Sequence, residues 1–420
     1  MVERTEMSAR SGSESEPDYR WVIVAASAVM LAISMGMMVN GFSVFFIPLN
    51  EEFGWQRGAV SLINFSGLLG LALGGILMGR IADRTSTRRV CLFGSIVLGL
   101  CIVGASYAEA LWQFYLLFFV GGFLGAGSLF APLVANVGSW FKSGAGLALG
   151  ITAAGQAIGQ GGVPYVIAIL IGAVGWRDAL MTTGVATLIG LVLMAMLLRQ
   201  PPHRTPAATG GDAATDSELS VLLPSNVVAR WLGAAVLFCC ICMSVPLMHL
   251  VPLVQDRGFP LEDAGSVIFL MLLVAIIGRV AFGKLADMIG AIRAYWIASC
   301  WQTLLVFGFV HLDTLDGFYI FAVVYGFGYA GVMTGILVCV RVLTPISRRA
   351  SVLGFVMLFA WLGHGVGGYQ GGLFFDITGN YTVSYGNAAV AGIVNLIIVG
   401  SLYFAVMRRR SAWRSQIEAA

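Results

Sequence analysis

The sequence predicts an all-α membrane protein in which twelve transmembrane helices form two pseudo-symmetric six-helix bundles. Three observations predict this fold: an apolar composition, twelve long apolar runs and an internal repeat. Of the 420 residues, 58% are hydrophobic and only 11% are charged, with a mean hydropathy of +0.88. A soluble domain carries about 25% charged residues. Lipid therefore has to be part of the solvent around this chain.

Twelve apolar runs are long enough to cross the hydrocarbon core, which takes about 20 residues. In lipid such runs have to be helical, because their backbone polar groups need partners within the segment. We place them, in chain order, near residues 21–49, 57–79, 89–108, 112–139, 144–171, 177–198, 227–254, 263–283, 292–311, 317–343, 350–375 and 384–407.

A polar stretch in the middle of the chain separates these runs into six and six. Residues 199–225 are rich in Pro, Gly, Ala, Thr and Asp, which is typical of a flexible aqueous linker. The linker defines a first bundle over residues 20–198 and a second over 226–407. We expect residues 1–19 to be a disordered cytoplasmic tail and 408–420 a second cytoplasmic tail.

The basic residues are concentrated on one side of this topology. With the N-terminus in the cytoplasm, only Arg57, Arg177 and Arg257 fall in outside loops. The inside loops and tails hold Arg80, Arg84, Arg88, Arg89, Lys142, Arg199, Arg204, Lys284, Arg293, Arg341, Arg348, Arg349, Arg408, Arg409, Arg410 and Arg414. By the positive-inside rule, we expect a multi-pass protein of the plasma (inner) membrane with both termini cytoplasmic.

The two halves repeat each other at a fixed offset. PLNEEFGW follows the first run, and PLVQDRGF follows the seventh, 204 residues later. GRIAD, Gly79 to Asp83, follows the second run, and GKLAD, Gly283 to Asp287, follows the eighth at the same offset. Two matches at one offset indicate a duplication. Duplicated halves of a membrane protein place a substrate site at their interface near the midplane, which predicts a secondary transporter.

The segment GRIADRTSTRR resembles the loop motif of the major facilitator superfamily, G-x-L-A-D-R-x-G-R-[KR]-x. Gly79, Asp83, Arg84 and Arg88 match it, whereas Ser86 stands where the motif prefers Gly. The resemblance implies the major facilitator fold and a conformational latch at these residues, in which Asp83 meets a helix N-terminus. The second copy keeps Asp287, but Met288 replaces the motif's Arg.

Within that superfamily the chain is similar to the monocarboxylate transporters and the bacterial oxalate/formate exchangers. NGFSVFFIPLNEEFGW resembles the opening of that family, WFKSGAGLALGITAAGQAIG its fifth-helix motif, and GWRDAL its next loop. The resemblance covers both halves of the chain. It implies transport of a small organic anion by alternating access.

Arg279 is the strongest candidate for binding that anion. It lies inside an apolar run, where a cation costs on the order of 3 kcal/mol. No acidic residue lies in the middle of any run to pair with it, since Asp83, Asp287 and Asp376 sit at run ends. A substrate carboxylate would supply the partner, and it suits the bidentate fork of Arg. Snorkelling to the interface is the alternative. The family also carries a substrate Arg at the matching place.

His364 is the second candidate, and it follows Trp361 by three residues in the eleventh run. The exchanger has an aromatic residue and a Lys at this spacing, so His replaces a fixed cation here. Its imidazole would be neutral or would titrate near pH 6.5. A neutral His bonded to a backbone carbonyl is the structural alternative. His249, near an outer helix end, is expected to have a structural or interfacial role.

Several polar residues complete the predicted site. Asn40 stands where monocarboxylate transporters have a Lys, and Ala275 where they have an Asp one turn before the Arg, so their Lys–Asp–Arg proton machinery is incomplete. Asn40 would bind substrate or a neighbouring helix. Tyr325 and Tyr329 share a helix face, as Gln156 and Gln160 do. These side chains and Tyr115 either line the cavity or pack.

Charge counting favours a small monocarboxylate, such as lactate or pyruvate, because Arg279 alone balances one carboxylate. A dicarboxylate exchanger of the oxalate/formate type would also need a charged His364. Proton symport and anion exchange both remain open. A proton-coupled drug exporter fits less well, since Pro164 follows the glycines of GITAAGQAIGQGGVP, and a non-transporting sensor would need a signalling domain.

No enzyme chemistry is indicated. The seven cysteines lie in apolar stretches, and the sequence has no metal-ligand pattern, nucleophilic triad or phosphate loop. We therefore expect neither a catalytic residue nor a metal or other cofactor. The expected partners are a small organic anion, the lipid bilayer and, as a candidate co-substrate, protons. A net charge of +3 gives no reason to expect nucleic acid, and we expect a monomer.

Overall fold

The computed structural model describes residues 18–141, 145–200 and 218–419. Most of the predicted tail at 1–19 and of the predicted linker at 199–225 lies outside these residues. The described chain is helical and contains no strand. Eleven of its helices are long and apolar enough to cross a membrane. The twelfth predicted span, at 292–311, is the α-helix α11 continued by a 3₁₀ segment, η6, to His311.

The first half contains six membrane-crossing segments, as predicted. In chain order its elements are α1 (Tyr19–Met35), η1 (Gly36–Asn40), η2 (Gly41–Phe45), α2 (Phe46–Phe53), α3 (Arg57–Arg84), α4 (Thr87–Ser106), α5 (Leu111–Val120), η3 (Gly121–Gly125), η4 (Ala126–Ser128), α6 (Phe130–Ser139), α7 (Ala145–Val174) and α8 (Trp176–Leu197).

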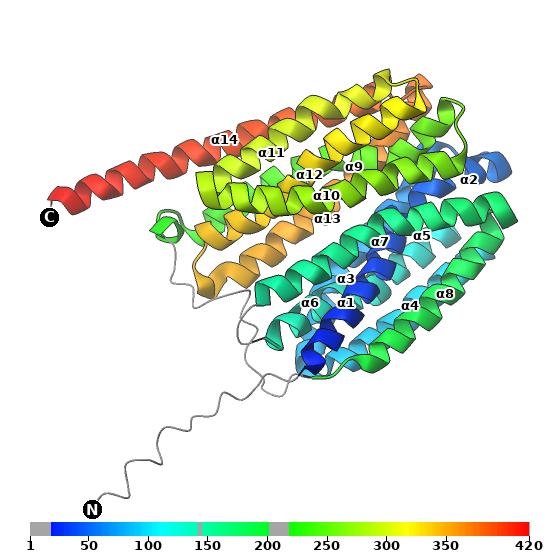
Figure 1. Ribbon diagram of the computed structural model, residues 1–420, viewed down its shortest axis with the longest axis horizontal. Coiled ribbons are helices and arrows are strands. Elements are labelled where there is room, and N and C mark those ends of the chain that lie inside the picture. Colours follow the sequence, from blue (N-terminus) through cyan, green and yellow to red (C-terminus); the bar gives the residue numbers. More distant parts are fainter. Residues whose placement is uncertain (1–17, 142–144, 201–217, 420) are drawn as a thin grey trace, which may run out of the picture.

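The second half follows a short 3₁₀ segment, η5. Its elements are η5 (Glu218–Val221), α9 (Ser225–Asp256), α10 (Leu261–Ile289), α11 (Ala291–Val306), η6 (Phe307–His311), α12 (Leu315–Leu343), α13 (Ile346–Thr378) and α14 (Thr382–Ala419). Helix α14 continues well past residue 407 into the predicted C-terminal tail, and it extends beyond the bundle in Figure 1.

The internal repeat is visible in the helix boundaries. Helix α3 begins at Arg57 and α10 at Leu261, 204 residues later, and α5 and α12 begin at Leu111 and Leu315, the same distance apart. The turns repeat as well. Gly54 and its counterpart Gly258 have φ values of 68° and 88°, and Gly175 and Gly379 have 83° and 72°. Only glycine adopts such values without strain, so the repeat conserves backbone geometry as well as hydropathy.

Two crossings of the first half are interrupted where the sequence predicts continuous helix. The first crossing passes through a π-helical turn, η1, and a 3₁₀ turn, η2; the fourth passes through η3 and η4. The amide of Asn64 on α3 donates to the carbonyl oxygens of Met38 and Val39 at 3.1 and 3.0 Å. It thereby provides partners for carbonyls at the irregular turn, which lipid could not supply.

The two bundles lie side by side (Figure 1). We call one end of the pair the terminus end and the opposite end the far end. The terminus end contains the start of α1, the end of α3, the starts of α9 and α13, and the end of α14. The far end contains α2 and the start of α3. The halves meet through α3 against α13 and α7 against α10. In the second contact the rings of Tyr165 and Phe269 stack with centroids 5.6 Å apart.

Candidate substrate-binding site

A central cavity of about 360 Å³ lies between the two halves. Eight segments line it: α1, η1, α6 and α7 from the first half, and α9, α10, α12 and α13 from the second. Most of its side chains are aliphatic, aromatic or Met, and none of the described lining residues is Asp or Glu. The polar lining consists of Thr152, Gln156, Gln160, Cys240, Arg279, Tyr329, Trp361 and His364.

Arg279 is the cation of this cavity. Its contact with the first half is a long one, 3.5 Å from its Nη1 to the carbonyl oxygen of Ala153 on α7, and its buried Nε has no hydrogen-bond partner. The phenol of Tyr329 interacts with the guanidinium from α12. Among the described residues no carboxylate pairs with Arg279. The guanidinium thus keeps an unused donor among the described residues, and Arg279 lines a cavity with mostly apolar walls.

His364 and Trp361 face the same cavity from α13. The His364 side chain is 3% exposed, and its Nε2 has no partner among the described residues. Its main-chain oxygen accepts a hydrogen bond from the Ser244 hydroxyl on α9, which fixes this turn of α13. Trp361 packs edge-on against Phe130 of the first half, with centroids 6.1 Å apart. The pair therefore forms part of the cavity wall across the interface between the halves.

Of the predicted binding residues, Arg279, His364, Tyr329, Gln160 and Trp361 come together in the cavity lining. Asn40, Tyr325 and Tyr115 are not in that lining.

The three remaining residues have other surroundings. The amide of Asn40 is fully buried and donates to the carbonyl oxygen of Gln160 at 3.1 Å, so it joins η1 to α7. Tyr325, one turn earlier in α12, stacks on Tyr329 with ring centroids 5.8 Å apart and is fully buried. Tyr115 donates to the carbonyl oxygen of Ala59 at 3.0 Å, near the start of α3 at the far end.

The predicted latch residues lie at the terminus end. Asp83 and Arg84 end α3, Arg88 follows in the first turn of α4, and all three are exposed. Asp287 occupies the matching last turns of α10 and is exposed too.

The far end holds an ionic network that the sequence did not reveal. Arg57 of α3 forms a bidentate pair with Asp256 of α9, with N–O distances of 2.7 and 2.6 Å. The main-chain N–H groups of Arg57 and Gly58 donate to the carboxylate of Asp376 at 2.9 and 2.6 Å. A carboxylate is favourable at this position because it faces a helix N-terminus. Both acids belong to the second half, so the network closes the far end across the interface.

Tyr381 extends this network into the protein. Its hydroxyl accepts from Arg57 at 2.8 Å and lies 3.2 Å from Nδ1 of His249. Nε2 of His249 lies 2.7 Å from the carbonyl oxygen of Gly368, which only accepts, so Nε2 carries the proton and Nδ1 accepts from Tyr381. Burial raises the pKa of Tyr381, so its hydroxyl stays protonated and can donate. The expected structural role of His249 is consistent with these contacts.

The sequence shows only that one acid of this network has a counterpart in the repeat. Asp256 lies 204 residues after Glu52, so the two acids are equivalent in the repeat. Their partners could not be predicted, because Arg57 and Asp256 are far apart in sequence and belong to different halves.

Comparison with known proteins places the chain among transporters. The family model of the Major Facilitator Superfamily matches residues 28–367. Monocarboxylate transporter 13 of Rattus norvegicus is 26% identical over 92% of this chain and 87% of its own length. MFS-type transporter 1 of an Ophiocordyceps species is 25% identical over 83% of this chain and 78% of its own length.

A solved structure has the same fold. The bacterial homologue of the human lysosomal transporter Spinster, in an inward-facing and occupied conformation, superposes with a TM-score of 0.68. It covers 95% of this chain and 97% of its own, at 14% sequence identity.

Proposed function

The chain belongs to the major facilitator superfamily and is a transporter, and from that premise we propose that it moves a small monocarboxylate of the lactate or pyruvate kind by alternating access. The observation that carries this proposal is Arg279, a cavity cation that no carboxylate of the described residues neutralises. The names of the monocarboxylate transporters among its relatives agree with that substrate class.

Charge and geometry support the assignment of Arg279 to the carboxylate. A guanidinium within a membrane helix is costly unless it finds a partner or a polar cavity. A substrate carboxylate accepts two parallel hydrogen bonds from the fork and removes that cost. We assign Tyr329 and Gln160 as additional donors, because both line the same space. The apolar walls and the Trp361 ring then contact the body of the substrate.

Exchange of an oxalate-type dicarboxylate is the second candidate, and His364 is the observation that favours it. Its Nε2 has no partner among the described residues, and His364 lines the cavity that holds Arg279. A protonated imidazole would bind a second carboxylate. A neutral one leaves the site with a single cation and favours a monoanion.

The lining of the cavity limits how a proton could be coupled to transport. Neither Asp nor Glu is among the described lining residues, so we propose no carboxylate as a proton carrier there. Symport would move the proton with the substrate or on His364, and anion exchange needs no proton site. We assign the latch to Gly79, Asp83, Arg84, Arg88 and Asp287. We also place the terminus end in the cytoplasm, in the inner membrane, and expect a monomer.

Uptake by proteoliposomes tests this proposal. Arg279→Gln removes the charge, and Arg279→Lys keeps it but loses the fork. We expect both variants to lower counter-flow of labelled pyruvate and lactate by at least about tenfold, as the loss of a charge-assisted hydrogen bond predicts. Arg293→Gln is the matched control, because Arg293 bonds the Tyr403 hydroxyl on the outer surface of the bundle.

Three further measurements make the result specific. Folded yield by size-exclusion chromatography has to remain unchanged in all three variants. Oxalate counter-flow measured beside pyruvate separates the two substrate classes, and an imposed pH gradient separates symport from exchange. Near-normal pyruvate uptake by Arg279→Gln would overturn the assignment of the site.

A further inference from the structure

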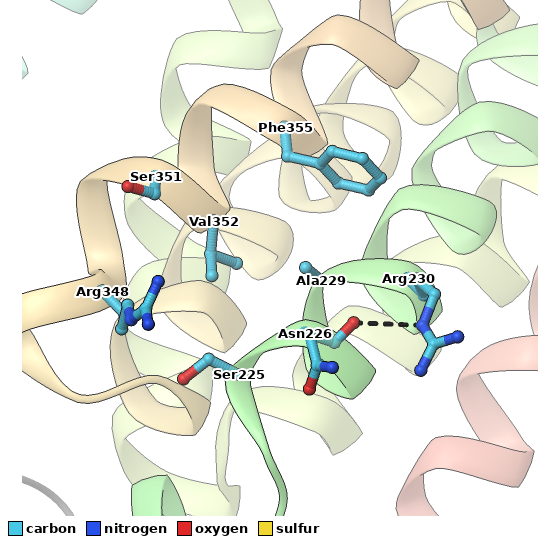
Figure 2. A pocket seen from close by; sticks show the side chains of 8 residues that line it. All are labelled: Ser225, Asn226, Ala229, Arg230, Arg348, Ser351, Val352 and Phe355. Atoms are coloured by element: carbon cyan, nitrogen blue, oxygen red, sulfur yellow. Dashed lines mark hydrogen bonds between the residues drawn. The ribbon is translucent and has the colours of Figure 1, made fainter.

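A second cavity, of about 700 Å³, lies between the starts of α9 and α13 at the terminus end. Figure 2 shows its eight lining residues, four from each helix: Ser225, Asn226, Ala229 and Arg230 from α9, and Arg348, Ser351, Val352 and Phe355 from α13. None of them lines the central cavity. Whatever this second cavity binds is therefore separate from the transported substrate.

The α13 side of the second cavity changes from charged to apolar along the helix. Ser225 and Arg348 lie within the first three residues of their helices, whereas Phe355 lies seven residues further along α13. Seven residues of helix span about 10 Å, so along α13 the lining changes from a charged to an apolar side chain over that depth, while Arg230 lies beside Ala229 on α9. Val352, Phe355 and Ala229 provide the apolar part, and Phe355 is itself partly exposed.

The charge of the lining is positive. Among the residues that the structure describes, it contains two arginines and neither Asp nor Glu. Nε of Arg230 donates to the main-chain oxygen of Asn226 at 3.3 Å, one turn back, which leaves its two terminal nitrogens available. The side chain of Arg348 has neither an ion pair nor a hydrogen bond within the part of the chain that the structure describes. Its neighbour Arg349, by contrast, donates to the carbonyl oxygens of Arg341 and Thr344.

The helix ends add to this positive field. Helices α9 and α13 both start at the cavity, so the positive ends of two helix dipoles converge on it. Figure 2 shows Arg230 and Arg348 on opposite sides of the cavity, so an anionic group between the two helix starts has an arginine on either side.

We propose that this cavity binds one anionic phospholipid, with the phosphate between Arg230 and Arg348 and an acyl chain along Val352 and Phe355. A soluble anion would satisfy the arginines but would leave the apolar part unused. A zwitterionic lipid would fill the apolar part and bring no net charge to the arginines. Both helices begin here as membrane-crossing segments, so the arginines lie at the depth of lipid headgroups, where basic residues attract anionic lipids.

Native mass spectrometry of delipidated protein in a neutral detergent tests the site. The probes are dioleoyl phosphatidylglycerol, dioleoyl phosphatidylcholine and inorganic phosphate. We expect one tightly bound phosphatidylglycerol, weaker binding of phosphatidylcholine and no binding of phosphate alone. The double variant Arg230→Gln/Arg348→Gln should bind phosphatidylglycerol roughly thirty-fold more weakly, given the contribution of each surface arginine to anionic lipid binding.

Two further variants make the test specific. Arg89→Gln removes the same charge at the same end from a residue outside the cavity, and it should bind phosphatidylglycerol as the parent does. Ser351→Glu places a negative charge inside the cavity and should weaken binding without removing an arginine. Equal losses in Arg89→Gln and the double variant, unchanged binding in Ser351→Glu, or tight binding of phosphate alone would each overturn the proposal.

Discussion

Two acids at equivalent positions of the repeat have different partners. Glu52, near the end of α2, pairs with Arg177 at the start of α8 at 2.8 Å, and both belong to the first half. Asp256, 204 residues later at the end of α9, pairs with Arg57 of the other half. The position equivalent to Arg177 is Tyr381, which also contacts Arg57. The duplicated scaffold thus carries one pair within a half and one pair between halves.

The two pairs also differ in how exposed their side chains are to solvent. Arg177 and Glu52 are 36% and 40% exposed, whereas Arg57 and Asp256 are 11% and 29% exposed. An exposed pair contributes little to stability, while removal of one partner from a buried pair is costly. Under alternating access, the pair within a half can persist throughout the cycle. The pair between halves has to break whenever the far end opens, so it helps to set the balance between conformations.

The largest effect is expected from reversing the charge of the interhalf acid. Asp256→Arg places two cations together at the far end and leaves Arg57 without its partner, a change worth on the order of 3 kcal/mol. We expect the far end to open and transport to fall by more than about tenfold. Maleimide labelling of Ser61→Cys, a buried position on α3 beside the network, should increase strongly in this background.

Two controls accompany that measurement. The same labelling in a protein with Ser61 intact gives the background from the native cysteines. The charge-swapped variant Arg57→Asp/Asp256→Arg should restore part of the protection. Unchanged labelling in Asp256→Arg would show that the pair does not hold the far end closed.

These two pairs illustrate which features of the structure the sequence could predict and which it could not. Helix positions follow from apolar runs, because lipid forces any such run into a helix. The repeat follows from matching turns such as those at Gly54 and Gly258. Cavity placement of Arg279 follows from the cost of an unpaired cation in lipid. Each of these inferences depends on one segment and its solvent.

Contacts between remote segments could not be predicted in this way. The π-helical turn at Gly36–Asn40 accepts a hydrogen bond from Asn64 of another helix, and the hydropathy of the turn does not predict that contact. Tyr325 and Tyr329 share a face, yet their stacking leaves only Tyr329 in the cavity lining. The partner of Asp256 is a residue of the other half, so the repeat gives no indication of it.

An intermediate effect on far-end labelling is expected from Tyr381→Phe, which leaves the ion pair between Arg57 and Asp256 intact. The change removes the hydroxyl that accepts from Arg57 and donates to His249. A buried hydrogen bond of this kind contributes about 1 kcal/mol, so we expect a several-fold rise in Ser61→Cys labelling, smaller than that of Asp256→Arg. Tyr385→Phe, one turn into α14, is the control, since its hydroxyl has no partner among the described residues. Equal labelling in both tyrosine variants would show that the contacts of the Tyr381 hydroxyl with Arg57 and His249 do not help to close the far end.

The smallest effect is expected from Glu52→Gln, the equivalent change within the first half. It weakens the bond to Arg177 and the contact with the Trp176 indole, but both partners stay in the same bundle. Because the pair is exposed, we expect at most about 1 kcal/mol of destabilisation, measured as a small drop in melting temperature. Far-end labelling and transport should match the parent, since nothing that joins the halves has changed. A rise in labelling as large as that of Asp256→Arg would mean that both pairs hold the far end closed, and the distinction between them would fail.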